Sequence, residues 1–124
     1  MTGVIIEIGP VSLELVTLDT PTAKAIIDQL PFKATAKTWG EEVYFQAPVS
    51  CSLEPDARDI IEPGEIAFWT EGQCIAIGYG KTPVSVGDEI RLAAKTNIWA
   101  RSQADIKALS SVAEGDPVVV RLKE

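Results

Sequence analysis

Hydrophobic and polar residues alternate along most of the chain, which is the pattern of half-buried β-strands. Residues 4–8 form an apolar run that ends at a Gly-Pro turn, and residues 12–18 then alternate with Leu13, Leu15 and Thr17 on one side. These two segments predict an N-terminal hairpin. Further strands are predicted at residues 42–53 (interrupted at Pro48 and resumed at 49–53), 66–69, 74–78, 90–93, 97–101 and 118–122.

One segment has clear helical periodicity. Thr20 can cap a helix and Pro21 suits its first position, where no backbone donor is needed. Pro31 ends the helix. Its apolar stripe has the spacing i, i+3, i+4 and i+7 and consists of Ala23, Ile26, Ile27 and Leu30. A second, shorter helix is predicted from Ser102 to Leu109.

About eight strands and two short helices therefore make up the predicted chain. The strands do not alternate with helices, which argues against a doubly wound α/β sheet and favours a small barrel or sandwich. The acidic, proline-bracketed residues 54–64 are expected to form a surface excursion. With 124 residues, of which 46% are hydrophobic, the chain is predicted to form a single domain over residues 1–124.

The charge of the chain limits the partners that we expect. The 18 acidic and 11 basic residues give a net charge of −7, and the bases form no cluster. Nucleic acids and anionic membrane surfaces need a basic face, so neither is an expected partner. No apolar stretch approaches the roughly 20 residues of a membrane span, and the first residues do not resemble a signal peptide. The cytoplasm is the expected location.

Metal and nucleophilic chemistry are both poorly supported by the residue types. The chain has no histidine, and Cys51 and Cys74 are isolated in sequence. We therefore expect reduced cysteines, no metal and no cofactor. Hydrolase chemistry is disfavoured because a serine nucleophile lacks its usual imidazole base.

Residues 78–82, Gly-Tyr-Gly-Lys-Thr, resemble part of a phosphate-binding loop. That loop requires a glycine where this chain has Ile75, and Pro83 follows where a helix should begin. The interpretation that we prefer is a glycine-rich strand exit, at which two backbone segments can approach closely.

Three stretches together resemble a known family. They are residues 38–45 (Thr-Trp-Gly-Glu-Glu-Val-Tyr-Phe), 64–69 (Gly-Glu-Ile-Ala-Phe-Trp) and 72–83 (Gly-Gln-Cys-Ile-Ala-Ile-Gly-Tyr-Gly-Lys-Thr-Pro). Their order and spacing are similar to those of short prokaryotic proteins with a cyclophilin-like barrel and no established function. The resemblance implies a closed β-barrel with a helix over each open end.

The resemblance also raises the question of isomerase activity. True cyclophilins isomerise the bond before proline with an arginine on the outer face of a strand after the first helix, and a tryptophan and a histidine line their pocket. The matching residues 43–48 contain no arginine, and the chain contains no histidine. Shared fold does not imply shared function, so a binding module is the leading hypothesis. A peptidyl-prolyl isomerase with a degenerate site is the alternative.

The candidate ligand-binding residues come from these same stretches. Alternation places Trp39 and Glu41 on the same face as Val43 and Phe45, which we assign to the core. It leaves an outward polar row that is either a binding groove or an ordinary solvated face, and this row consists of Glu42, Tyr44 and Gln46. Trp39 and Trp69 pack in the core or serve as ligand platforms, and Tyr79 and Lys81 could hold an anionic group. The full candidate set is Trp39, Glu42, Tyr44, Gln46, Trp69, Tyr79 and Lys81.

The expected ligand is a small molecule or a peptide segment. A subunit that works only beside a partner is a third hypothesis. A homodimer is compatible with the sequence, although no residue pattern demonstrates one.

Overall fold

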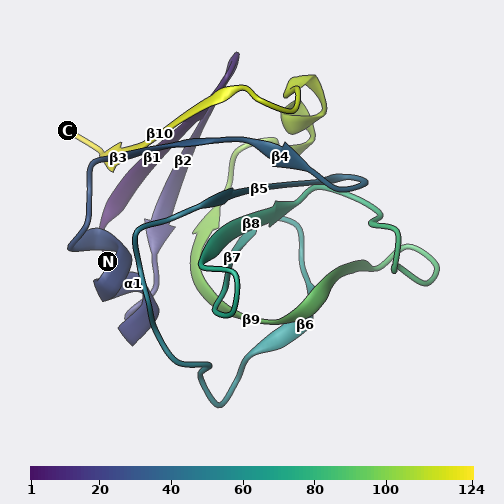
Figure 1. Ribbon diagram of the computed structural model, residues 1–124, viewed down its shortest axis with the longest axis horizontal. Coiled ribbons are helices and arrows are strands. Elements are labelled where there is room, and N and C mark those ends of the chain that lie inside the picture. Colours follow the sequence, from purple (N-terminus) through teal and green to yellow (C-terminus); the bar gives the residue numbers. More distant parts are fainter.

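The computed structural model describes residues 1–124 as a mainly β domain (Figure 1). Its strands are β1 (Gly3–Ile8), β2 (Val11–Thr17), β3 (Phe32–Thr35), β4 (Lys37–Thr38), β5 (Glu42–Gln46), β6 (Arg58–Ile61), β7 (Glu65–Trp69), β8 (Cys74–Gly78), β9 (Ile90–Ser102) and β10 (Pro117–Leu122). Its helices are α1 (Pro21–Ile27) and the 3₁₀-helix η1 (Ile106–Ser111). The predicted mainly β class is confirmed, with ten strands where the sequence indicated about eight.

The strands form one antiparallel sheet that curls into a nearly closed barrel. The hydrogen-bonded order is β3-β10-β1-β2-β9-β7-β8-β5-β4, and β6 pairs with β9 beside this path. The two ends of the order, β3 and β4, are consecutive in the chain and are separated only by the fully buried Ala36. The chain itself therefore passes directly from one edge of the sheet to the other.

The barrel encloses a core of 24 buried hydrophobic residues. Alternate residues of β1, β2, β5, β7, β8 and β10 enter it, as the period of an extended chain requires. Val43 and Phe45 of β5 and Ile75 and Ile77 of β8 are among its completely buried members, as is Trp99. The core assignments of Val43 and Phe45 are thereby confirmed.

Both helices add side chains to this core. Thr20 caps α1 as predicted, since its hydroxyl accepts a hydrogen bond from the Ala23 N–H over 3.1 Å. Ile26 of α1 and Leu109 of η1 are completely buried. In Figure 1 the two helices lie far apart, α1 at the lower left and η1 at the upper right.

Three element predictions need correction. Residues 49–53 are not a strand, because Asn97 binds their backbone instead: its side-chain N–H donates to the Ser52 carbonyl over 2.9 Å. The surface excursion 54–64 contains β6, whose pairing partner in β9 could not be seen from local sequence. The two predicted strands 90–93 and 97–101 form the single strand β9.

Strand β9 gives the molecule a second, outer layer. Its C-terminal half pairs with β7 and β2 in the barrel wall, and its N-terminal half pairs with β6 outside the barrel. Figure 1 shows β9 curving around the ends of β7 and β8. A cluster of five buried hydrophobic residues fills the space between these layers: Ile61, Ala67, Ala76, Ile90 and Leu92.

Candidate functional site

The outer face of β5, β8 and β7 carries three rows of paired residues. Gln46 pairs with Cys74, which also pairs with Trp69; Tyr44 pairs with Ala76, which also pairs with Ala67. In the third row, Glu42 pairs with Gly78. The three β8 residues of these rows, Cys74, Ala76 and Gly78, are small, whereas β5 contributes larger side chains. The small β8 side chains leave room beside β5 on the outer face of the sheet.

Trp39 belongs to this outer face and not to the core face that alternation assigned to it. Gly40, with φ of +58°, makes the tight turn between β4 and β5, and the Trp39 N–H donates to the Glu42 carbonyl over 3.0 Å. Trp39 therefore lies opposite Glu42 across the hairpin, and residues opposite each other share a face. The prediction failed because alternation does not continue through a tight turn.

A pocket of about 300 Å³ lies between this face and β9. Ten residues line it: Trp39, Glu42, Tyr44, Trp69, Cys74, Ala76, Leu92, Ala93, Ala94 and Thr96. Four of the seven sequence-predicted residues are among them, and they come from three separate segments of the chain. We call this cavity the outer pocket.

Glu42 is the one acidic or basic residue in the outer pocket lining. Its side chain is only 7% exposed, and its Oε1 atom has no hydrogen-bond partner. Burial raises the pKa of Glu42 to about 7 from an ordinary value of 4.5, because a carboxylate loses its hydration there. A buried polar atom without a partner destabilises a fold by about 1–3 kcal/mol. The predicted polar row thus faces outward, but at Glu42 it is buried.

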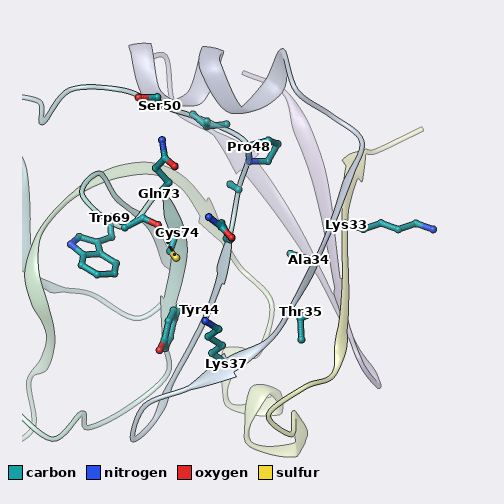
Figure 2. A pocket seen from close by; sticks show the side chains of 14 residues that line it. Lys33, Ala34, Thr35, Lys37, Tyr44, Pro48, Ser50, Trp69, Gln73 and Cys74 are labelled. Atoms are coloured by element: carbon teal, nitrogen blue, oxygen red, sulfur yellow. Dashed lines mark hydrogen bonds between the residues drawn. The ribbon is translucent and has the colours of Figure 1, made fainter.

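A second cavity adjoins the outer pocket. It measures about 880 Å³ and shares Tyr44, Trp69 and Cys74 with the outer pocket. Figure 2 shows Trp69, Cys74 and Tyr44 on one side of it, with Lys37 beside Tyr44 and Lys33 extending away on the far side. We call it the open groove. Gln46 lines only this groove.

Trp69 takes its position from the turn between β7 and β8. A Cβ atom at Gly72 would collide with the six-membered ring of the indole, so this ring lies directly against the turn backbone. The indole N–H of Trp69 is buried and has no acceptor. Trp69 is half-buried and borders both cavities.

Tyr79 and Lys81 line neither cavity. Tyr79 follows Ile75 and Ile77 at intervals of two and packs against the barrel core, on the opposite face of β8. The Lys81 side chain is exposed and lies 3.9 Å from Asp88. These two candidates are therefore separated from the five that gather on the outer face.

The preferred interpretation of the glycine-rich residues 78–82 is confirmed. A Cβ atom at Gly78 would collide with Ile90 of β9, and one at Gly80 would collide with the Glu41 carboxylate. The backbone of Lys81 also pairs with Glu41, whose N–H donates to the Lys81 carbonyl over 2.8 Å. The glycines thus bring the β4–β5 turn and β9 against the exit of β8.

Sequence reasoning missed the residues that β9 contributes to the outer pocket. Leu92, Ala94 and Thr96 alternate with Ala93 and Lys95, so periodicity marks one face of β9. It does not reveal that this face covers the outside of another strand. Sequence reasoning also missed Cys74 as a residue of the outer pocket. Burial is the main cause that raises the pKa of its thiol; the charge of Lys37 lowers this pKa, and the charge of Glu42 raises it further.

No group of three or more histidine, cysteine, aspartate or glutamate side chains is placed to hold a metal ion. No helix has the length and apolar character to cross a membrane.

Comparison with known proteins adds the family. The model of the family described as cyclophilin-like matches residues 2–121. The chain belongs to the cyclophilin-like family. No curated protein matches it.

Two solved structures have the same fold as this cyclophilin-like chain. The hypothetical protein AF2241 from Archaeoglobus fulgidus is 34% identical with a TM-score of 0.84, and the match covers 98% of this chain and 95% of that one. McbB, solved in complex with tryptophan, is 14% identical with a TM-score of 0.70. That match covers 97% of this chain but only 44% of McbB.

Proposed function

We propose that this cyclophilin-like protein is a binding module whose small-molecule ligand occupies the outer pocket. The observation that carries the proposal is the buried carboxyl group of Glu42, which has an unpaired oxygen in an otherwise uncharged pocket. An unpaired buried oxygen destabilises the free protein, and a ligand that pairs with it recovers that energy.

The shape of the site supports the same conclusion. A volume of about 300 Å³ is at the lower end of the range for ligand pockets, about 300–1,000 Å³. Apolar and aromatic walls around a few polar groups are typical of such pockets. The open groove shares Tyr44 and Trp69 with the outer pocket, so a ligand too long for the pocket can extend into it.

The test is an NMR titration of the ¹⁵N-labelled protein with separate small cations, anions, neutral compounds and Xaa-Pro peptides. Tryptophan belongs in the panel because McbB carries it. We expect at least one class to shift the indole N–H signals of Trp39 and Trp69 while leaving Tyr79 and Lys81 unchanged. If no compound shifts the outer pocket signals, the binding proposal is wrong.

The alternative, isomerase activity, is tested by the same samples. Exchange spectroscopy on the Xaa-Pro peptides measures their cis–trans rate with and without protein. Accelerated exchange with shifts at Tyr44 and Gln46 would replace the binding module by an isomerase that uses the open groove. Shifts without acceleration would leave the binding proposal intact.

A further inference from the structure

The outer pocket combines one acidic group with an unusual share of the aromatic side chains. The chain contains eight aromatic residues, and three of them line the pocket: Trp39, Tyr44 and Trp69. Lysine, arginine and histidine are absent from its lining. A lone carboxyl group without a positive partner is therefore surrounded by aromatic and aliphatic side chains.

These features fit one chemical class of ligand. Aromatic faces carry partial negative charge and attract cations, above all quaternary ammonium groups, which are apolar on their surface yet charged. A carboxylate in a low-dielectric pocket adds a strong attraction for a positive charge and repels a negative one. Resting on the proposed binding function, we infer that the outer pocket selects an organic ammonium ion, whose charge pairs with Glu42 between Trp39, Tyr44 and Trp69.

Two other classes of ligand, anionic and neutral, fit the outer pocket less well. A carboxylate or phosphate ligand meets no basic residue in the outer pocket. A neutral ligand fits the aromatic walls and can accept a hydrogen bond from the protonated carboxyl group of Glu42. It does not pair with the negative charge of the ionised carboxylate. The net charge of −7 also favours the approach of cations over anions.

The proposal predicts the direction of the pH dependence. An ammonium ion binds the ionised form of Glu42, and the free protein holds a proton there up to about pH 7. The other titratable residues of the pocket are Tyr44 on the same strand and Cys74 on β8; β9 contributes none, and Lys37 lies in the adjoining groove. Affinity should therefore rise by about tenfold between pH 6 and pH 8. A neutral ligand that accepts a hydrogen bond from Glu42 would show the opposite trend.

The experiment compares choline with its uncharged isostere, in which a tert-butyl group replaces trimethylammonium. Binding to the full chain is followed by tryptophan fluorescence and by the NMR signals of Trp39 and Trp69. We expect choline to bind at least tenfold more tightly than the isostere at pH 8, and this preference to shrink at pH 6. A parallel arm with a peptide that carries trimethyl-lysine distinguishes a free amine from a modified side chain as the source of the ammonium group, and binding in either arm supports the proposal.

Two variants test whether the charge of Glu42 itself, and not the net negative charge of the protein, selects choline. Glu42→Gln should remove the preference for choline, whereas Glu41→Gln makes the same charge change at the neighbouring, exposed position and should keep it. The wild-type comparison of choline with its isostere stands even if Glu42→Gln folds poorly. Equal binding of both probes, or tighter binding at pH 6, would overturn the ammonium proposal and retain the binding function. Failure of every probe and of the wider panel at these tryptophans would overturn both.

Discussion

Glu42 and Glu65 form a natural comparison within one sheet. Each is the first residue of a strand, β5 and β7 respectively, and their exposed fractions are 7% and 6%. Glu65 binds Arg58 through two hydrogen bonds, of 3.0 and 2.6 Å, and accepts a third from the Glu62 N–H over 2.7 Å. Glu42 retains an unpaired oxygen.

The partners decide the direction of each pKa shift. Burial acts to raise the pKa of Glu65, but hydrogen bonds from Arg58 and Glu62 and the charges of Arg58 and Arg101 lower it below its usual value. At Glu42 burial acts alone and raises the pKa to about 7. With similar exposed fractions, Glu65 thus forms a structural ion pair, whereas Glu42 remains an unsatisfied acid. We conclude that the missing partner, in addition to burial, marks the candidate site.

The largest expected effect is the pH dependence of Glu42→Gln. The folded protein holds this proton up to about pH 7 and the unfolded chain only up to about 4.5, so the wild type loses stability as pH rises between these values. The variant has no such proton. Relative to wild type it should gain roughly 3 kcal/mol between pH 4 and pH 8. Urea unfolding at both pH values measures this, and a constant difference would contradict the raised pKa.

Glu65→Gln should show the opposite behaviour. The lowered pKa means that Glu65 stabilises the fold above its ordinary value of 4.5 and that this contribution is lost as pH falls below it. Because the paired Arg58 side chain is 43% exposed and can be hydrated again, we expect a loss of about 1–3 kcal/mol near pH 7. The loss should shrink in acid. Unfolding curves in which both glutamate variants respond to pH in the same direction would refute the comparison.

Gly72→Ala tests how the outer pocket is held open. The added methyl group must displace the Trp69 ring, and forced repacking of this kind destabilises proteins by about 1–3 kcal/mol. We expect a shifted Trp69 indole signal and weaker choline binding. Glu71→Ala, an exposed change in the same turn, is the control and should leave both unchanged. An unmoved Trp69 signal in Gly72→Ala would show that the turn does not position the ring.

Tyr44→Leu tests the aromatic contribution on a smaller scale. Removal of one ring from a cation site weakens binding by about 0.5–1 kcal/mol, or roughly two- to fivefold. Tyr44→Phe keeps the ring and should bind choline within about twofold of the wild type. Calorimetric titration of both variants checks this. Equal losses in the two would assign the effect to the hydroxyl group instead.

The smallest effect is expected at Lys81, outside both cavities. Its contact with Asp88 is an exposed ion pair, so Lys81→Ala should change stability by less than about 0.5 kcal/mol. Choline affinity measured by fluorescence should not change. A clear loss of binding would show that Lys81 belongs to the binding site and would contradict its placement outside the outer pocket.

The sequence by itself determined the strands whose residues alternate and the cap of the first helix. Val43 and Phe45 enter the core because the period of a strand is two, and Thr20 caps α1 because its hydroxyl reaches the free Ala23 N–H. The same alternation identified Glu42, Tyr44 and Gln46 as outward-facing. These features depend only on local backbone geometry, which neighbouring residues encode.

Only the tertiary structure decided what covers that outward face. Trp39 joins it through a tight turn that reverses the expected side, and Leu92 of β9 reaches it because Gly78 lets Ile90 approach β8 closely. Whether a buried glutamate is paired depends likewise on a distant segment: β6 supplies Arg58 to Glu65, and no segment supplies a base to Glu42. Burial and charge pairing arise from contacts between residues far apart in the chain, and local periodicity carries no information about them.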